Sequence, residues 1–401
     1  MKVVHITYST SGGAGIAAYR LHLALLDSGV DSSILCLKNK IASAPNVVVV
    51  KKLKHSFFKR AFHKIVPIIQ SFKNRKVLEK LKGTYEVATF PTTDYRIYNH
   101  PLVKKATIIN LHWVGDFLNY PTFFKKCKIP VVWTLHDMNP FLGSFHYHVD
   151  DAFNTQKFAA LNKKLMTIKR KSYQKSSIHT IVTPSKWLLN ESQKSNLFST
   201  YSHKHIYNGA DENVFKPFDV DEVRETLKLP KNKMIFLFVS QNITSVRKGF
   251  DIIEGILDEL ALENILFLAI GIPPLKKHKN IHYLGNINNS NTMAKIYAAS
   301  NAFLLPSRED NLPNTMVESL LCGTPVISSN TGGMKEVIKN GENGYLVNET
   351  TSEAFKNQIL KFIGTEALFS REHIALAAKN KFSKKKVAVN YLNLYKSILN
   401  E

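Results

Sequence analysis

Short runs of apolar residues recur along the chain, and each run ends in polar residues or glycine. The runs are continuous in valine, isoleucine and leucine rather than alternating, which indicates strands buried on both faces, as in parallel sheets covered by helices. Helical stretches, such as residues 17–26 and 250–260, lie between the runs. The predicted strands form two successive series: residues 3–9, 32–37, 107–113, 130–137 and 179–185, then residues 234–240, 265–271, 281–285, 302–307 and 325–329.

Two series of this kind predict an α/β protein with two doubly wound, Rossmann-like domains. A chain of 401 residues is long enough for about two or three domains, each with its own core. The series change near GADENVFKPFDVDEV, so we assign residues 1–208 to the first domain and 209–379 to the second. Ligands of open α/β sheets bind beyond the carboxyl ends of the strands, and two such domains face to face would leave a cleft between those ends.

The apolar pattern does not predict an integral membrane protein or a secreted one. The longest apolar run, residues 265–275, is shorter than the roughly 18 residues that a membrane-spanning helix needs. The N-terminal MKVVHITYS fits a first strand better than a signal peptide. Cys36, Cys127 and Cys322 form no CxxC pair, which indicates a reducing compartment. We therefore expect a cytoplasmic protein with three buried cysteines.

The chain is strongly basic, with 54 lysine and arginine residues against 31 acids and a formal net charge of +23. Such an excess attracts polyanions, and nucleic acid and acidic lipid both qualify. Residues 51–82 hold eleven of the cations and one acid, with phenylalanine and isoleucine at roughly helical spacing, although Pro67 should kink or end a helix there. Such a segment is typical of an interfacial membrane helix, so we predict contact of 51–82 with an anionic membrane surface; a solvated surface helix is the alternative.

Glycines and polar residues follow several predicted strands. Gly12 and Gly13, in STSGGAGIAAYRL, lead into a helix, which is a form that lets the backbone approach a pyrophosphate. The segment has no GxGxxG and no Walker lysine, which argues against a hydride-transfer enzyme or an ATPase. His136 ends the run PVVWTLHD. Arg247 and Lys248, in SVRKGFD, follow another strand, where they could neutralise a leaving diphosphate or could simply be solvated.

Residues 309–326, EDNLPNTMVESLLCGTPV, place Asp310 and Glu318 around a turn. Pro313 suits the first turn of a helix, and the later glycine and proline suit its end, so Glu318 should lie inside a short helix and Asp310 just ahead of it. The N–H groups of residues 312–315 would then point at the space before the helix, which suits phosphate or sugar oxygens. In the alternative interpretation, Asp310 or the next residue caps the helix and Glu318 faces water.

Taken together, five segments resemble a known family. They are IYNGADENVFKP (206–217), RKGFD (247–251), IYAASNAFLLPS (296–307), EDNLPNTMVESLLCGTPVI (309–327) and SNTGGMKEVIKNGENGYLV (329–347). Their order and spacing resemble glycosyltransferase family 4, the retaining transferases with twin Rossmann domains called the GT-B fold. The resemblance covers nearly the whole chain and is specific in its second half.

The resemblance implies roles for individual residues. Asp310 would hold hydroxyl groups of the donor sugar, and Glu318 would accept hydrogen bonds from the ribose of the nucleotide. His136 would lie beside the reacting sugar carbon, and a last helix of about residues 384–399, within 380–401, would cross back onto the first domain. Lys248 would be catalytic together with His136 and Asp310, and the groups that meet the sugar and the phosphates would be Gly12, Gly13, Arg247, Lys248, Leu312, Pro313, Asn314 and Thr315.

Three departures from the family pattern matter. The usual first acid is glutamate, and Asp310 is one methylene shorter, which would loosen its contact with a hydroxyl or favour another sugar. The usual arginine ahead of the lysine is missing from VSQNITSV, and Arg247 is the nearest substitute. Related members often follow the LHD stretch with cysteines, whereas this chain has GSFHYHVDD at residues 143–151.

We predict no metal site in the chain. His146, His148, Asp150 and Asp151 could suggest one, but two histidines two residues apart in a loop more often belong to an acceptor-side surface. Residues 219–221, Asp-Val-Asp, imitate a DxD metal motif, but they precede a helix, where an N-cap is expected. We therefore expect neither a cofactor nor a requirement for a divalent ion.

The expected activity is retaining transfer of a sugar from a UDP- or GDP-linked donor to a glycan or lipid-linked acceptor in bacterial surface polysaccharide synthesis (capsule, O-antigen or exopolysaccharide), at the inner face of the cell membrane. Negative charge grows on the diphosphate as the bond breaks, so cations and helix N–H groups aimed at it favour the transition state. Alternatives are a same-fold nucleotide-sugar epimerase or phosphorylase, an inactive scaffold and a basic nucleic-acid-binding protein. The last would need a recognition helix or a stacking platform, which the sequence lacks, so we expect no nucleic-acid partner.

Overall fold

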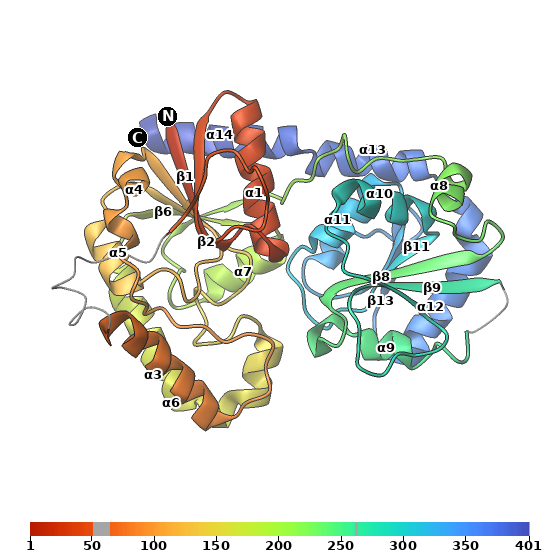
Figure 1. Cartoon of the computed structure of the whole chain (residues 1–401), viewed down its shortest axis with the longest axis horizontal. Coiled ribbons are helices and arrows are strands. Elements are labelled where there is room, and N and C mark those ends of the chain that lie inside the picture. The colour runs from red at the N-terminus through yellow and green to blue at the C-terminus, as the bar shows by residue number, and fades with distance from the viewer. Residues whose placement is uncertain (51–64, 261–263, 401) are drawn as a thin grey trace. The chain divides into compact units, whose positions relative to one another are not determined.

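The computed structural model describes residues 1–50, 65–260 and 264–400 (Figure 1). Part of the basic segment that the sequence assigned to a membrane surface, residues 51–64, therefore lies outside the described residues. In the described ranges, no helix is both long enough and apolar enough to cross a membrane.

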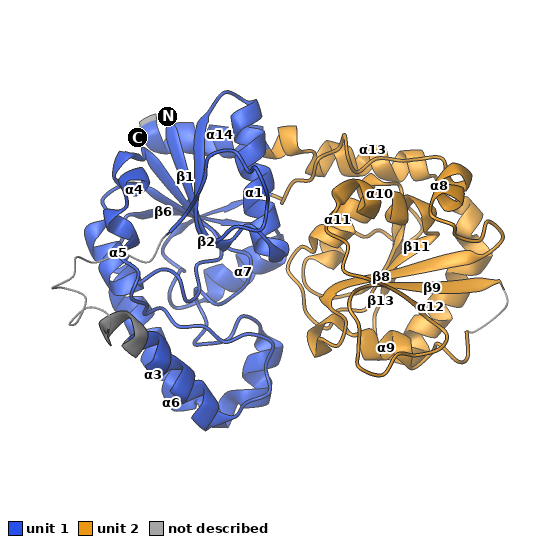
Figure 2. Ribbon diagram, in the orientation of Figure 1, with its two compact units in different colours: residues 1–206, 388–401 blue, residues 207–387 orange. Residues whose placement is uncertain are grey.

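The chain divides into two compact units (Figure 2). Unit 1 comprises Met1–Ile206 together with Ala388–Glu401, and unit 2 comprises Tyr207–Val387. The change into unit 2 lies two residues before the boundary drawn from the sequence. The return to unit 1 lies within the last helix rather than at residue 380, because the residues that pack on the first sheet begin one turn into that helix.

Unit 1 is built on a parallel sheet with the strand order β3-β2-β1-β4-β5-β6-β7. The five strands predicted in the first half of the chain are all present, which follows from their buried valine and isoleucine runs. The outer strands β3 and β7 were not predicted, since β3 has three residues and β7, SHKH, has no apolar side chain. The strands are β1 (Lys2–Ser9), β2 (Asp31–Lys38), β3 (Val47–Val49), β4 (Ile108–Leu111), β5 (Val131–Thr134), β6 (Ile178–Thr183) and β7 (Ser202–His205).

Helices connect these strands, and two of them correct the sequence interpretation. Pro67 lies within α3 (Ile65–Leu81), which continues beyond it, so it does not end that helix. The stretch taken as a loop with two histidines becomes the start of a long helix at His148. The described helices of unit 1 are α1 (Gly12–Asp27), α3 (Ile65–Leu81), α4 (Pro101–Lys105), α5 (Tyr120–Lys126), α6 (His148–Tyr173) and α7 (Lys186–Lys194), with a 3-10 turn η1 (Ile97–Asn99).

Unit 2 has a second parallel sheet with the strand order β10-β9-β8-β11-β12-β13. The five strands predicted in the second half are present, and the added strand β13 lies at the edge beside β12. The doubly wound architecture expected from the two series of apolar runs is therefore confirmed. The strands are β8 (Met234–Asn242), β9 (Ile265–Ile272), β10 (His282–Gly285), β11 (Ala302–Leu305), β12 (Val326–Ser329) and β13 (Gly344–Val347).

Several helices of unit 2 follow the sequence prediction. The helix expected around Glu318 is α11, and the helix expected near residues 384–399 is α14. The helix expected at 250–260 is shorter, because α9 ends at Glu254 and only turns follow. The helices are α8 (Val220–Thr226), α9 (Phe250–Glu254), α10 (Ser290–Ala299), α11 (Asn314–Leu321), α12 (Ser352–Thr365), α13 (Arg371–Phe382) and α14 (Lys384–Asn400), with 3-10 turns η2 (Val246–Lys248), η3 (Met334–Glu336) and η4 (Glu366–Leu368).

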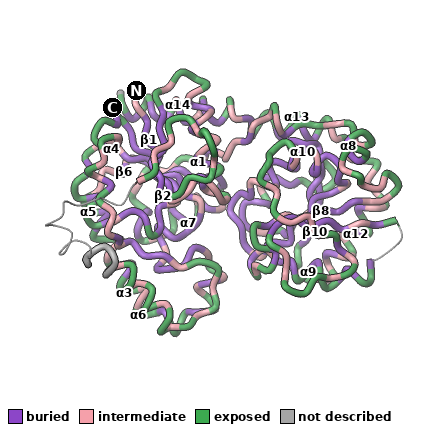
Figure 3. The backbone as a smooth tube through the Cα atoms, viewed as in Figure 1, coloured by how far each residue is buried: buried purple, intermediate pink, exposed green. Residues whose placement is uncertain are grey.

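The buried residues follow the strands of each sheet, whereas the outward helix faces are exposed (Figure 3). The end of α14 joins the core of unit 1 through two buried tyrosines. The Asn110 side-chain amide donates to the Tyr395 hydroxyl at 2.7 Å, and the hydroxyls of Tyr391 and Thr134 lie 3.0 Å apart. The C-terminal helix thus completes the first unit, as the resemblance implied.

Candidate functional site

Three of the site residues predicted in unit 2 meet at one carboxylate. Asp310 follows β11, and its Oδ2 accepts a hydrogen bond from the Lys248 ammonium and lies 3.4 Å from Nη1 of Arg247. The same Arg247 nitrogen donates to the backbone carbonyl of Glu309 at 2.9 Å. Asp310 and Arg247 are buried, whereas 21% of the Lys248 side chain is exposed. The structure therefore joins the predicted acid and both predicted cations into one charged group.

The charges around Asp310 decide its protonation. Burial raises the pKa of its carboxyl, but Lys248 and Arg247 act in the opposite direction, and the backbone N–H of Asn311 adds a hydrogen bond at 3.0 Å. The net pKa lies below the usual value. Asp310 is therefore ionised at neutral pH, and two cations surround it.

Two glycines allow the backbone to approach this group closely. Gly249, just after η2, has φ +71°, and a Cβ there would lie 2.0 Å from the carbonyl oxygen of Pro306. Gly332, in the SNTGG stretch, has φ +55°, and its Cβ would lie 1.8 Å from the carbonyl oxygen of Asp310. L side chains rarely adopt such φ values. Glycine at these positions lets RKG and NTGG pack against the loop that carries Asp310.

Helix α11 begins at Asn314, and Pro313 is its N-cap residue without a side-chain hydrogen bond. The alternative in which Asp310 or its neighbour caps the helix is therefore wrong. The predicted set of amides from 312 to 315 also needs correction, because proline has no N–H to donate. The Pro313 carbonyl instead accepts hydrogen bonds from Met316 and Val317 at 3.1 and 3.3 Å. Leu312, Asn314 and Thr315 remain the amides at this end of the helix.

Glu318 lies on the second turn of α11 and is 7% exposed. One of its carboxylate oxygens accepts a hydrogen bond from the Tyr297 hydroxyl at 3.1 Å. The interpretation in which Glu318 faces water is therefore wrong. A buried carboxylate with a hydroxyl partner is able to accept further hydrogen bonds, as a ribose diol would require.

Gly12 and Gly13 stand at the first turn of α1. Gly12 has φ +75°, and Ser11, the N-cap residue, makes no side-chain cap hydrogen bond. A Cβ on Gly13 would meet no atom within 4 Å, whereas a Cβ on Gly15 would lie 2.3 Å from the carbonyl oxygen of Ser9. The glycines therefore have different structural roles. Gly15 permits close packing of the helix on the strand, and Gly13 leaves open space beside the start of the helix.

His136 follows β5 and belongs to a line of three imidazoles. Its Nε2 lies 3.0 Å from Nδ1 of His112, and Nε2 of His112 lies 3.0 Å from Nδ1 of His5. Burial lowers the pKa of His136 to about 4, although the charge of Asp137 raises it. The predicted catalytic histidine is therefore uncharged at neutral pH.

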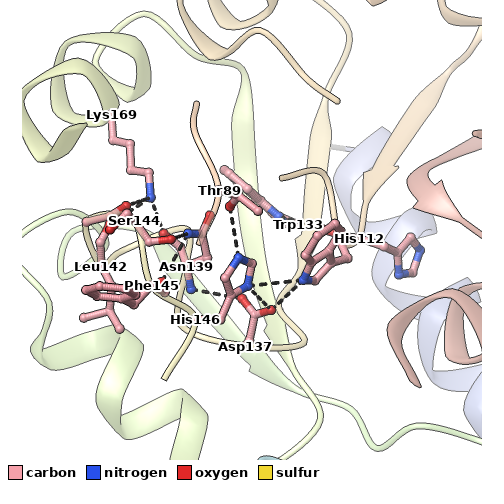
Figure 4. Close-up of polar contacts among 12 residues, drawn as sticks. Thr89, His112, Trp133, Asp137, Asn139, Leu142, Ser144, Phe145, His146 and Lys169 are labelled. Carbon is pink, nitrogen blue, oxygen red and sulfur yellow. Dashed lines mark hydrogen bonds and ion pairs between the residues drawn. The ribbon is translucent and has the colours of Figure 1, made fainter. Parts of the chain in front are cut away.

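Asp137, next to His136, is the centre of a second polar group (Figure 4). Its Oδ2 accepts hydrogen bonds from His146 Nδ1 at 2.6 Å and from Trp113 Nε1 at 2.7 Å, while Oδ1 accepts from the Asn139 backbone at 3.0 Å. His146 Nε2 lies 2.9 Å from the Thr89 hydroxyl. Burial raises the pKa of Asp137, but these partners together bring it below its usual value.

The stretch taken for an acceptor-side surface therefore has another role. His146 is buried, so it does not belong to an acceptor-side surface. His148 lies 3.4 Å from Glu191, and Asp150 accepts a hydrogen bond from the Glu86 backbone at 3.2 Å. In the ranges that the structure describes, histidine, cysteine and carboxylate side chains form no group of three that could hold a metal ion. The N-cap predicted at Asp219 is confirmed, since its carboxylate accepts from the Glu222 backbone at 2.8 Å.

A buried lysine holds the loop between β5 and α6 (Figure 4). The Lys169 ammonium, 0% exposed, donates to the backbone carbonyls of Leu142 and Gly143 at 2.8 Å each and to that of Asn139. Burial lowers the pKa of Lys169 to about 7, and the charge of Asp137 opposes this shift. Three acceptors around one nitrogen require three donors, which only the protonated amine supplies.

The space among these side chains is small. A cavity lined by His112, His136, Asp137 and His146 has a volume of about 10 Å³, which is about the space of one water molecule. Another pocket of unit 1, about 430 Å³, lies near η1 and the ends of α4 and α5 and contains none of the predicted residues. The polar group of unit 1 is therefore a packed support for His136 rather than a sugar pocket by itself.

Sequence reasoning missed several of these residues. His112 and Trp113 were included in the predicted strand 107–113, although both lie at its end, as His136 does in the strand 130–137, and this position could have identified them. His5 and Lys169 carry no comparable signal. They come from the middle of a strand and of a helix, and only the folded chain brings them close to the residues that follow β4 and β5.

Residues 219–381, which include every predicted site residue of unit 2, match the family model Glycosyl transferases group 1. The chain is 26% identical over 211 residues to N-acetyl-alpha-D-glucosaminyl L-malate synthase of Bacillus anthracis, covering 49% of this chain and 54% of that protein. It is 27% identical over 180 residues to the "Uncharacterized 41.2 kDa protein in cps region" of Klebsiella pneumoniae, covering 42% and 48%. The chain thus spans about half the length of these curated relatives.

A solved structure extends the likeness to the whole chain. The crystal structure of Anabaena Alr3699/HepE in complex with UDP and glucose has a TM-score of 0.69 and 15% identity, and the match covers 99% of this chain and 100% of that one. At this identity the likeness concerns the fold. The two α/β units with parallel sheets and this structural similarity confirm the expected GT-B fold.

Proposed function

We propose that this protein is a retaining, metal-independent glycosyltransferase of family 4 that transfers a sugar from a nucleotide-sugar donor to a glycan or lipid-linked acceptor. The observation that carries the proposal is the group formed by Asp310, Lys248 and Arg247 beside the start of α11. It lies in the part of the chain that matches the glycosyl transferase family model.

The chemistry of the transfer suits this group. The bond between the anomeric carbon and the phosphate oxygen breaks, and its electron pair goes to the diphosphate. The acceptor hydroxyl oxygen forms the new bond on the same face of the sugar, and its proton goes to the departing phosphate oxygen. Lys248, Arg247 and the amides of Leu312, Asn314 and Thr315 would stabilise the negative charge that develops on the diphosphate.

Asp310 has two uses in this proposal. It holds Lys248 and Arg247 close together, and it remains ionised, so that it can accept hydrogen bonds from sugar hydroxyls. Glu318 would accept from the ribose diol. His136 would lie near the sugar on the acceptor side, and Gly13 would leave room for a phosphate at the start of α1.

The relatives support a donor class and a pathway type. The Anabaena protein was solved with UDP and glucose, which supports a UDP-linked donor, with a GDP-linked donor as the second choice. The Klebsiella relative belongs to a cps region, which supports a role in bacterial surface polysaccharide synthesis. We propose an enzyme that works at the inner face of the cell membrane without a divalent ion.

The experiment is a thermal-shift screen with UDP, GDP, ADP and their sugars, followed by transfer assays with and without EDTA. A nucleotide at 100 times its Kd should raise the free energy of unfolding by about 2.7 kcal/mol. Sugar transfer that needs an acceptor and survives EDTA supports the proposal. Conversion of the donor without an acceptor would favour an epimerase, and strong salt-dependent binding of nucleic acid without nucleotide specificity would favour the nucleic-acid alternative.

A further inference from the structure

Three neighbouring strands place three histidines in a row. His5 lies within β1, His112 follows β4, and His136 follows β5; these strands are adjacent in the sheet order. Each of the two nitrogen–nitrogen distances along the row is 3.0 Å. At this distance one nitrogen of each pair carries a hydrogen and the other accepts it.

The row of histidines ends at His5. Nε2 of His5 is buried and has no hydrogen-bond partner among the described residues. Another imidazole, that of His22, has its ring centre 6.2 Å from that of His5, and both of its nitrogens have hydrogen-bond partners. His22 Nε2 donates to the Pro45 carbonyl at 2.9 Å, and Nδ1 lies 2.7 Å from the Ser32 hydroxyl.

The row is uncharged at neutral pH. Burial lowers the pKa of His5 well below its usual value, and the nearby His22 adds to this shift. Burial does the same for His112, with His5 and His136 adding to it. The charge of Asp137, next to the row, raises the pKa of His136, which still lies at about 4. Each imidazole therefore carries a single N–H.

A neutral row has only two arrangements. In the first, His5 Nδ1 donates to His112, His112 Nδ1 donates to His136 Nε2, and the hydrogen of His136 must be on Nδ1. In the second, every donor is reversed, His136 carries its hydrogen on Nε2, and His5 is left with an N–H on its buried Nε2. The first arrangement leaves a lone pair without a partner, and the second leaves an N–H without an acceptor.

These two costs are not equal. Among buried backbone groups, an orphaned N–H is rarer than an under-satisfied acceptor, and we apply the same order to the imidazole nitrogens. We propose that His5 and His112 are positioning residues that fix the tautomer of His136, so that Nδ1 of His136 carries the hydrogen and is a hydrogen-bond donor. The environment of His5, which is two side chains away, thus determines which nitrogen of His136 carries the hydrogen.

The tautomer has a consequence for substrate, which rests on the proposed function. A donor at Nδ1 pairs with an oxygen lone pair, such as a sugar hydroxyl or a phosphoryl oxygen. It cannot accept the proton of the acceptor hydroxyl while the row stays neutral. His136 would therefore orient the donor sugar, and a phosphate oxygen would take the proton.

The tautomer can be read without any substrate, by long-range ¹H–¹⁵N NMR of the full chain labelled with ¹⁵N-histidine at pH 7. His22 and His203 are internal references, since their carbonyl partners place the hydrogen on Nε2 of His22 and on Nδ1 of His203. We expect the His136 signals, assigned by loss in His136→Asn, to resemble those of His203. A His136 signal like that of His22, or one of a charged imidazolium, would overturn the proposal.

Two substitutions of equal size test the role of His5. His5→Asn keeps a donor near the position of Nδ1 and should leave the hydrogen of His136 on Nδ1. His5→Asp offers an acceptor there and should move the hydrogen of His136 to Nε2. If both folded variants show the same His136 tautomer, His5 does not set it. If one does not fold, the wild-type spectrum still decides the tautomer.

The outcome separates this inference from the proposed function. A His136 with the expected tautomer in a protein that transfers no sugar would refute the transferase and keep the histidine row. Sugar transfer by a protein whose His136 carries its hydrogen on Nε2 would refute the proposed histidine row and support the transferase. In an active enzyme, His112→Phe should lower kcat at least tenfold and change its pH profile, whereas His179→Phe, outside the row, should change neither.

Discussion

Lys248 donates a hydrogen bond to the buried carboxylate of Asp310, and this contact joins two residues that lie 62 positions apart in the sequence. The pair meets because η2 follows β8 and the loop of Asp310 follows β11, and these two strands are neighbours in the sheet. Both residues therefore lie beyond the carboxyl ends of adjacent strands, where open α/β sheets bind their ligands.

Lys248→Ala should lower kcat for sugar transfer by about a hundredfold or more, because a preorganised cation stabilises charge that develops in the transition state. The measurement is the steady-state rate with a donor found in the thermal-shift screen. Arg247→Ala is the comparison, and it should also weaken folding, since Arg247 is buried. If Lys248→Ala keeps the full rate and only Arg247→Ala loses it, then Arg247 rather than Lys248 stabilises the diphosphate.

Glu318→Ala should weaken nucleotide binding, because a charged acceptor for the ribose diol contributes about 1.5 to 3 kcal/mol. Isothermal titration with the bound nucleotide gives the change in Kd. The control is Tyr297→Phe, which removes the hydroxyl partner of Glu318 at 3.1 Å and keeps the carboxylate. Unchanged donor affinity and full activity in Glu318→Ala would remove this residue from the site.

Lys169→Met should lower the free energy of unfolding by about 3 kcal/mol or more, because two buried carbonyls and one partly buried carbonyl lose their donor at about 1 to 3 kcal/mol each. Urea denaturation measures this change. Lys163→Met, an exposed lysine of the same helix, is the matched control and should change stability by less than about 0.5 kcal/mol. Equal stability of both variants would mean that Lys169 does not hold the loop.

The free energy of unfolding should decrease as the pH is lowered from about 6.5 to 4. His5, His112 and His136 have pKa values that burial lowers in the folded state, so the unfolded chain binds more protons in this window. Each such histidine contributes stability above pH 6.5 that is lost on acidification, with a slope of about 1.4 kcal/mol per pH unit. Urea titrations at several pH values measure the slope, and a flat profile between pH 6.5 and 4.5 would contradict the buried neutral row.

Part of the basic segment predicted to contact a membrane, residues 65–82, is described by the structure, and residues 65–81 of it form α3. Phe72 and Val77 are 53% and 38% exposed, and the Lys76 ammonium lies 4.5 Å from the centre of the Phe72 ring. An exposed phenylalanine among lysines suits a membrane interface, where each cation contributes about 1 kcal/mol near an anionic surface.

Changing Lys73, Arg75 and Lys76 to glutamine should therefore weaken binding to vesicles of phosphatidylglycerol, and adding Lys59, Arg60 and Lys64 should abolish it, while donor affinity stays the same. Vesicle sedimentation measures the binding. The control removes three exposed lysines of unit 2: Lys276, Lys277 and Lys279. Equal loss in the control would indicate a general charge effect, and no loss in either would refute the membrane surface.

The sequence alone predicted the architecture, because continuous apolar runs that alternate with helical stretches are typical of parallel strands covered by helices. It also determined α11 and the position of Asp310 ahead of it, since proline and glycine fix helix ends locally. Short motifs such as RKGFD and SNTGG were recognised without the fold, although the close approach of their glycines to Pro306 and Asp310 appears only in the structure.

Only the tertiary structure decided which side chains meet. Nothing local to His5 or Lys169 indicates a partner, since their contacts lie 107 and between 26 and 30 residues away. Strand order places β1, β4 and β5 side by side, and that order depends on long-range packing rather than on propensity. Burial then keeps the histidines uncharged, and three carbonyl acceptors favour the protonated form of Lys169, so these states could be inferred only from the folded chain.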